Sequence, residues 1–278
     1  ELQRDLTTKI GNANYDIGHL FGASGGGGNA GCIGCVCQNP LSSNDVAKGG
    51  GFSSPANNKP EGDTFDIDYV AHEMGHQLGA NHTFSYDSEE RTSVNVEPGS
   101  GTTIMAYAGI CGSNNNVQNN SDPYFHAASV VQMYAVLQRP TDCSAKISNN
   151  NGVPTADAGV DYIIPKGTAF VLTGAGTDPN NDPITYLWEQ YNNTNTTQPP
   201  LATATAGPIY RSLLPKVSPM RYFPAMTSVL ANNLVPKWEV TPSVARTLNF
   251  SLVVNDNKAT GNQAARDVMT VTVTNDGP

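Results

Sequence analysis

Residues 72–82 read HEMGHQLGANH and hold three of the five histidines of this 278-residue chain. His72 and His76 are four residues apart, so on a helix both imidazoles project from the same face and can meet one metal ion. Gly79 lets the chain leave the helix, because glycine adopts backbone conformations that other residues avoid. The turn brings His82 back as a third ligand. Three neutral imidazoles leave a fourth position open for water, as in catalytic zinc sites.

Glu73 is the acidic residue of this stretch, and it need not bind the metal itself. It follows His72 directly, so its carboxylate can reach a water molecule held by the zinc ion. Zinc lowers the pKa of such a water toward ~7 and polarises the scissile carbonyl group. Glu73 would take the proton of the water and pass it to the leaving amine. The spacing therefore predicts a zinc peptidase, and two histidines that share a helix by chance are the competing interpretation.

The composition narrows the classes of partner. Charged residues make up 14% of the chain, the formal net charge is −9 and the isoelectric point is near 4.9. An acidic chain argues against a nucleic-acid partner, because phosphate contacts need clustered Lys and Arg. No run of 18 or more apolar residues occurs, so no membrane span is expected. The many Gly, Pro, Asn and Thr residues indicate loops and short strands, as in secreted β-rich proteins.

The five cysteines predict structural disulfides in an exported protein. Cys37–Cys143 is the favoured pair, which would tie an early strand to the end of the first domain. The pairing of Cys32, Cys35 and Cys111 stays open, and an odd count leaves at least one thiol outside any intrachain pair. A zinc or redox function of Cys32 and Cys35 is the less favoured alternative, because no second CxxC accompanies them.

A polar linker divides the chain. Residues 144–154, SAKISNNNGVP, are rich in Asn and end in Pro, which is typical of a linker. Before it, apolar residues at helical spacing predict helices over 67–80 and 126–138. Strands are expected over 15–22 and 30–37, joined by a run of glycines.

After the linker the apolar period changes to two. Strand-like stretches rich in Val, Ile, Thr and aromatic residues alternate with Asp, Asn, Gly and Pro, a pattern typical of an antiparallel sandwich. Residues 192–237 lack a clear pattern and are expected to be an extended insertion between strands. The predicted domains are 1–145, a linker over 146–153, and an all-β sandwich over 154–278.

The zinc motif and the later stretch GSGTTIMAYAG (99–109) together resemble the metzincin metallopeptidases. In that clan HExxHxxGxxH is followed by a methionine turn. The resemblance implies an α+β catalytic region, zinc as cofactor, protein or peptide substrates, and Met105 as a hydrophobic floor beneath the metal. A plain core methionine is the alternative. Among metzincins the chain is most similar to reprolysin/adamalysin-like enzymes, especially bacterial secreted members.

The segment YDIGHLF before the glycine run is similar to the edge strand of that group. Such a strand would hold the substrate as an added antiparallel strand. The residues that the resemblance assigns to this role are Ile17, Gly18, His19, Leu20 and Phe21. His19 is interpreted as a surface or structural histidine and not as a metal ligand.

Three features depart from the reprolysin pattern. Tyr107 stands two residues after Met105, where astacins and serralysins have a movable fifth zinc ligand that stabilises the tetrahedral intermediate. A place in the wall of the substrate pocket is the alternative for Tyr107. Thr83 follows His82, where adamalysins usually have Asp. About 14 residues precede the edge strand, so the catalytic region is expected to lack its N-terminal part.

The stretch from Pro154 to Gln190 resembles PKD-like or related immunoglobulin-like sandwiches of secreted bacterial enzymes. Trp188 is expected as a core aromatic of an inner-face strand. Within DPNND, the side chains of Asp178, Asn180 and Asp182 offer oxygen ligands for Ca²⁺. Plain Asx turns are the favoured alternative for these residues. A module of this kind either binds a target or acts as a spacer between domains, and the first role implies an extracellular target for the sandwich.

The sequence thus predicts a secreted zinc endopeptidase with a C-terminal immunoglobulin-like domain. His72, His76 and His82 would bind zinc and Glu73 would act as the general base. Export is inferred from the resemblance, the cysteines and the composition. The alternative function is a binding or adhesion protein that contains an inactive, truncated metzincin remnant.

Overall fold

The computed structural model describes residues 1–86, 92–139, 143, 145, 147–196 and 198–277, and the chain divides into two compact units. The N-terminal unit consists of Glu1–His82, Thr103–Met105 and Asn120–Lys146. The C-terminal unit consists of Thr83–Thr102, Ala106–Asn119 and Ile147–Pro278. The stretch that follows the zinc motif therefore groups mostly with the residues after the linker.

Within the predicted linker, residues 147–153 contain neither helix nor strand. Residue 146 lies outside the described residues. The predicted domain boundaries stay a prediction. The compact units are not continuous along the chain, since residues 83–102 and 106–119 belong to the C-terminal unit.

Helices of the N-terminal unit lie where the helical spacing predicts them. The π-helix η3 (Thr64–Ala71) continues directly into α2 (His72–Leu78), and α4 spans Ala127–Leu137. Short helical turns open the chain: α1 (Leu2–Asp5), η1 (Leu6–Ile10) and η2 (Asn12–Asn14). Helix α2 ends because Gly79 adopts a φ of 115°, a left-handed conformation that suits glycine.

A three-stranded sheet accompanies these helices. It consists of β1 (His19–Phe21), β2 (Gly27–Asn29) and β3 (Gly51–Ser54). The order is β1-β3-β2, with β1 parallel and β2 antiparallel to β3. Strands β1 and β2 are therefore the two edges of this sheet.

The predicted strand over 30–37 is wrong. The strand in this region is β2, which lies within and just after the glycine run. Gly31, Gly34 and Cys37 have φ values of 74°, 71° and 67°, so the chain turns repeatedly where an extended backbone was expected. The apolar residues of this stretch therefore lie in turns, where Ala30 and Cys35 are buried and Ile33 is exposed.

Two disulfides lie in the N-terminal unit. Cys37–Cys143 confirms the favoured pair, and the second bond joins Cys32 to Cys35. Since Cys32 and Cys35 are bonded to each other, they do not form a thiolate pair for zinc. Cys111 keeps its thiol and is buried in the C-terminal unit.

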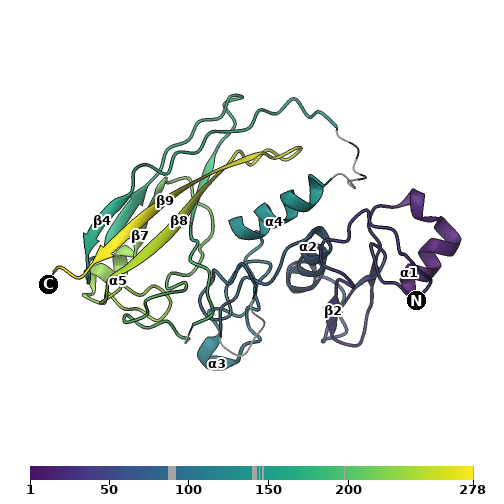
Figure 1. Cartoon of the computed structure of the whole chain (residues 1–278), viewed down its shortest axis with the longest axis horizontal. Helices are drawn as coiled ribbons and strands as arrows, with labels where there is room; N and C mark the ends of the chain where they lie inside the picture. Colours follow the sequence, from purple (N-terminus) through teal and green to yellow (C-terminus); the bar gives the residue numbers. More distant parts are fainter. Residues whose placement is uncertain (87–91, 140–142, 144, 146, 197, 278) are drawn as a thin grey trace. The chain divides into compact units, whose positions relative to one another are not determined.

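The C-terminal unit contains two sheets. The larger has the order β4-β9-β8-β6, and the smaller pairs β5 with β7. The long antiparallel strands β8 and β9 run side by side (Figure 1). Strand β4 is parallel to β9, which differs from the wholly antiparallel arrangement that the sequence predicts. The elements are β4 (Tyr162–Pro165), β5 (Phe170–Thr173), β6 (Thr185–Gln190), β7 (Met220–Phe223), β8 (Arg246–Asn255) and β9 (Ala264–Thr274), with short helices α3 (Gly112–Asn115) and α5 (Met226–Leu230).

Both sheets of this unit contribute to one apolar core. Alternate residues of β8 are fully buried, as expected for a strand with one face on the core. The ring of Phe250 in β8 lies 4.7 Å from the ring of Phe223 in β7, measured between centroids. Trp188 is buried, as predicted, and its indole N–H donates to the Pro219 carbonyl at 2.9 Å. The mixture of helices and sheets agrees with the predicted α+β catalytic region, whereas the immunoglobulin-like sandwich stays a prediction.

Candidate active site

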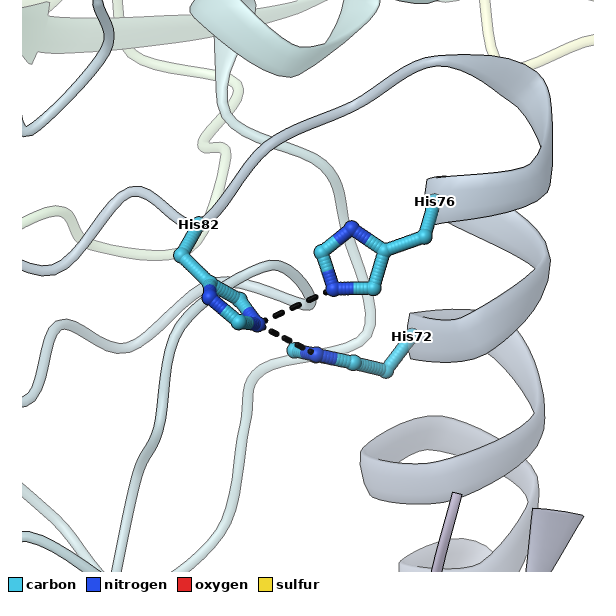
Figure 2. A group of neighbouring side chains, drawn as sticks. All are labelled: His72, His76 and His82. Atoms are coloured by element: carbon cyan, nitrogen blue, oxygen red, sulfur yellow. Dashed lines mark hydrogen bonds between the residues drawn. The ribbon is translucent and has the colours of Figure 1, made fainter. Parts of the chain in front are cut away.

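Helix α2 and the turn after it bring three histidines together. His72 and His76 project from one side of the helix, and His82 approaches them from the following coil (Figure 2). The Nε2 atom of His82 lies 3.2 Å from Nε2 of His72 and 2.9 Å from Nε2 of His76. These three residues are called the histidine triad below. The turn at Gly79 is what returns the chain toward the helix face.

Backbone carbonyls fix the tautomers of two of these rings. The Nδ1 atom of His72 lies 2.7 Å from the Ile104 carbonyl oxygen, and Nδ1 of His76 lies 2.7 Å from that of Ala80. A carbonyl oxygen only accepts, so each Nδ1 carries the proton and each Nε2 presents a lone pair. Lone pairs that converge in this way are the arrangement that a zinc ion stabilises. The residues present therefore fit a zinc ion.

Burial keeps the imidazoles of His72 and His82 neutral. It lowers the pKa of His82 to about 3, and the neighbouring His76 adds to the shift. Burial also lowers the pKa of His72 well below its ordinary value, with further contributions from the other two rings. The neutral ring is the form that binds a metal. The site is thus ready to bind a cation near neutral pH.

Glu73 is packed against strand β2. A Cβ atom at position 28 would overlap Oε1 of Glu73, so any other residue there would displace the carboxylate. Burial raises the pKa of Glu73 to about 7, and the backbone N–H of Ala30 partly offsets this. A carboxyl group with a pKa near neutrality can both accept and release a proton. The only signal for this contact in the sequence is the glycine run itself.

Met105 is fully buried and packs against α2. A Cβ atom at Gly75 would lie 2.5 Å from the Met105 sulfur, which shows how closely the two segments approach. Met105, Ile104 and Ala80 form the apolar cluster of this unit. Its predicted role as a floor beneath the metal stays a prediction.

The residues predicted to hold substrate lie on β1 and just before it. Leu20 and Phe21 are 52% and 60% exposed, Gly18 is buried and Ile17 is half-buried. The imidazole of His19 hydrogen-bonds to Gln77 at 2.7 Å and to Ser53 at 2.9 Å, which agrees with a structural role. The described contact with Glu73 is made by β2 and not by β1. Substrate binding by residues 17–21 stays a prediction.

Tyr107 belongs to the C-terminal unit. Its ring centroid lies 4.5 Å from that of Phe84, and its backbone N–H donates to the Ser100 carbonyl at 2.9 Å. Its predicted role as a further zinc ligand stays a prediction.

The DPNND stretch forms the Asx turn that the alternative interpretation describes. Oδ1 of Asp178 accepts the backbone N–H groups of Asn180 at 2.8 Å and Asp182 at 2.9 Å. Asp256 completes a group of three carboxylates that lie close enough to share a metal ion. However, the Lys258 ammonium binds Asp182 at 2.7 Å and neutralises part of their charge. Calcium is therefore not assigned to this group.

Sequence comparison adds independent support to the zinc motif. Residues 1–136 match the family model described as Metallo-peptidase family M12B Reprolysin-like. The comparisons with curated proteins and with solved structures gave no match. The matched segment contains the triad, Glu73 and Met105, and supports a zinc metallopeptidase that acts on proteins. Across the described part of the chain, no helix has the length and apolarity needed to span a membrane. Residues 1–136 are thus similar to the reprolysin-like metallopeptidases of family M12B.

Proposed function

We propose that this protein is a secreted zinc endopeptidase of the metzincin type. The observation that carries the proposal is the convergence of three Nε2 atoms of the histidine triad, with the buried Glu73 on the same helix. The match of residues 1–136 to reprolysin-like peptidases supports it. The two disulfides support export, because such bonds persist in oxidising compartments.

The histidine triad would hold the metal through its Nε2 atoms. Zinc, when bound, supplies a Lewis acid that polarises the scissile carbonyl and acidifies a water molecule. The carbonyls of Ile104 and Ala80 keep two of the rings in the tautomer that ligation requires. Glu73, with a pKa of about 7, accepts the proton of the attacking water and delivers it to the leaving amine.

An extended substrate is proposed to pair with the edge of β2. This strand is an edge of its sheet, and Gly28 within it contacts the carboxylate of the general base. Main-chain pairing gives affinity for any extended peptide, whereas side-chain pockets give selectivity. Residues 17–21 on the opposite edge are the alternative place for the substrate.

The C-terminal unit is proposed to be a PKD-like or immunoglobulin-like β-sandwich. Two sheets that share one core support this assignment. Binding of an extracellular target by this unit rests on analogy of fold alone.

The test is zinc content and casein cleavage by the whole 278-residue chain. We expect one zinc per chain and cleavage that a chelator abolishes. The matched variant Glu73→Gln should bind zinc as the wild type does but lose about 100-fold or more in kcat, because it lacks the general base. Zinc without cleavage in the wild type would favour the binding-protein alternative. Unchanged cleavage by the zinc-loaded variant would refute the role of Glu73.

A further inference from the structure

The third histidine lacks the support of a helix. His82 lies in the coil after α2, whereas His72 and His76 lie on the helix itself. On its N-terminal side, the Asn81 backbone N–H donates to the Gln132 side chain at 2.9 Å. The position of His82 therefore also depends on what holds the residue that follows it.

Thr83, which follows His82, is held at three points within the C-terminal unit. Its carbonyl oxygen accepts the backbone N–H groups of Val96 and Glu97, both at 2.9 Å. Its hydroxyl donates to Oε2 of Glu97 at 2.6 Å. The other oxygen of this carboxylate accepts the backbone N–H of Thr102 at 2.9 Å. Glu97 is fully buried, so one carboxylate fixes two places where the chain passes from one unit to the other.

Asn193, Thr194, Thr196 and Gln198 bind this segment from the β part of the same unit. They follow β6 and begin the stretch in which the sequence shows no clear pattern. Oδ1 of Asn193 accepts the backbone N–H of Asn95 at 2.9 Å, and Thr194 donates its N–H to the Asn95 carbonyl at 3.2 Å. The Asn95 amide in turn donates to the Phe84 carbonyl at 2.7 Å. A chain of hydrogen bonds thus runs from Asn193 to the residue beside Thr83.

Gln198 makes the second attachment. Its Oε1 accepts the backbone N–H of Gly99 at 2.9 Å, and its Nε2 donates to the Ser85 hydroxyl at 3.3 Å. Thr102 adds a third, because its hydroxyl donates to the Ser212 carbonyl at 3.3 Å. The segment between the zinc motif and Met105 is therefore anchored along its described length to the β part of the C-terminal unit.

We propose that Asn193 and Gln198 are positioning residues for the metal centre. They hold residues 83–102, and so fix the backbone on the C-terminal side of His82. This inference rests on the proposed zinc peptidase. It goes beyond that proposal because it gives the C-terminal unit a role in positioning a metal ligand. On this view, the unit does more than tether the peptidase to a target.

The test compares neighbouring asparagines in the full-length protein. Asn193→Ala removes the acceptor for Asn95. Asn192→Ala is the matched control, because the described bonds of the Asn192 side chain stay within the β part: to Thr247 and Asn249 at 3.0 Å and to Gln190 at 2.8 Å. Competition with a chromogenic chelator measures zinc affinity. Hydrolysis of a casein peptide gives kcat, and thermal unfolding gives the stability.

We expect Asn193→Ala and Gln198→Ala each to weaken zinc binding about fivefold, the effect of one lost hydrogen bond, and to lower kcat. Asn192→Ala should lower the melting temperature about as much as Asn193→Ala does, but it should leave zinc affinity unchanged. Asn193→Asp keeps an acceptor oxygen and should restore zinc affinity. Equal zinc affinity and kcat in the variants at 192 and 193 would overturn the inference while the peptidase stands. A wild-type chain that binds no zinc would overturn both.

Discussion

At the scale of single residues, the position of the general base depends on Gly28. A Cβ atom there would overlap Oε1 of Glu73 and push the carboxylate away from its place beside β2. We expect Gly28→Ala to lower kcat about 10- to 100-fold, because small displacements of a catalytic group are costly, and to leave zinc content unchanged. Steady-state kinetics and metal analysis of the purified protein measure both quantities.

Gly27 supplies the control for this substitution. It lies on the same strand with a φ of 115°, and an added Cβ would meet nothing within 4 Å. Gly27→Ala should therefore lower stability through backbone strain but change kcat little. A loss of activity as large as that of Gly28→Ala would show that contact with Glu73 is not the cause.

Asp256 links stability to pH. Burial alone raises the pKa of this carboxyl, but the backbone N–H groups of Lys258 and Gln263 and the Asn151 amide outweigh burial and lower it. A lowered folded-state pKa stabilises the fold above the unfolded-state value of about 3.9, and this contribution disappears as the pH falls through the folded-state value. The stability difference between wild type and Asp256→Asn should be largest near neutral pH.

Denaturant unfolding at a series of pH values measures this difference. It should begin to shrink as the pH falls below about 4, where the carboxyl takes up a proton in the unfolded chain, and it should reach its minimum once the pH is below the folded-state pKa. A difference that stays constant over the whole series would mean that the charge of Asp256 does not contribute to stability.

Single-residue predictions from sequence succeed where the geometry is local. The triad lies within eleven consecutive positions, and helix geometry plus one glycine is enough to bring its rings together. The contact of Gly28 with Glu73 and the bridge from Thr83 to Glu97 are different, because each forms between segments that meet only in the folded chain. No spacing rule encodes such contacts.

At the scale of elements, the end of α2 is the feature that shapes the site. Gly79 has φ 115°, and a Cβ atom there would overlap the Val136 side chain of α4. We expect Gly79→Ala to cost about 1–3 kcal/mol from backbone strain, with overlap added, and to weaken zinc binding because His82 is displaced. Denaturant unfolding and chelator competition measure the two effects.

The overlap and the strain can be separated. In a Val136→Ala background the overlap with Cγ2 of Val136 is removed and a contact of 3.2 Å with Cβ remains, so the remaining loss on Gly79→Ala reports mainly the strain. If that background abolished the whole loss, the left-handed conformation would not be the reason for glycine at this position.

Helices were easier to predict than strands for a physical reason. The spacing in 126–138 predicts α4 to within one residue at each end, because a helix satisfies its own backbone. A strand needs a partner, and the stretch 30–37 has none because its left-handed residues turn the chain. The clear period-two stretches after the linker became strands because each one pairs with another over several residues.

At the scale of the whole molecule, the interleaving of the two units is the feature that the sequence hides. Residues 83–102 and 106–119 carry no regular apolar period, so nothing in them indicates a partner. Their hydrogen bonds go to Asn193, Gln198 and Ser212, about a hundred residues later in the chain. A linker rich in asparagine suggests a division at 144–154, but the compact units also divide the chain at residues 82–83, 102–103, 105–106 and 119–120.

The disulfide Cys37–Cys143 closes a loop that contains the triad and the interleaved segments, because its cysteines are 106 residues apart. Cys32–Cys35 closes a loop with a separation of only 3. Since loop closure restricts the unfolded chain more for longer loops, we expect Cys37→Ala/Cys143→Ala to cost about 5 kcal/mol and Cys32→Ala/Cys35→Ala about 2 kcal/mol. Denaturant unfolding of both double variants, with zinc saturating, measures the difference. An equal or larger loss for the short loop would mean that native contacts of the Cys32–Cys35 turn, and not chain entropy, determine what these bonds contribute.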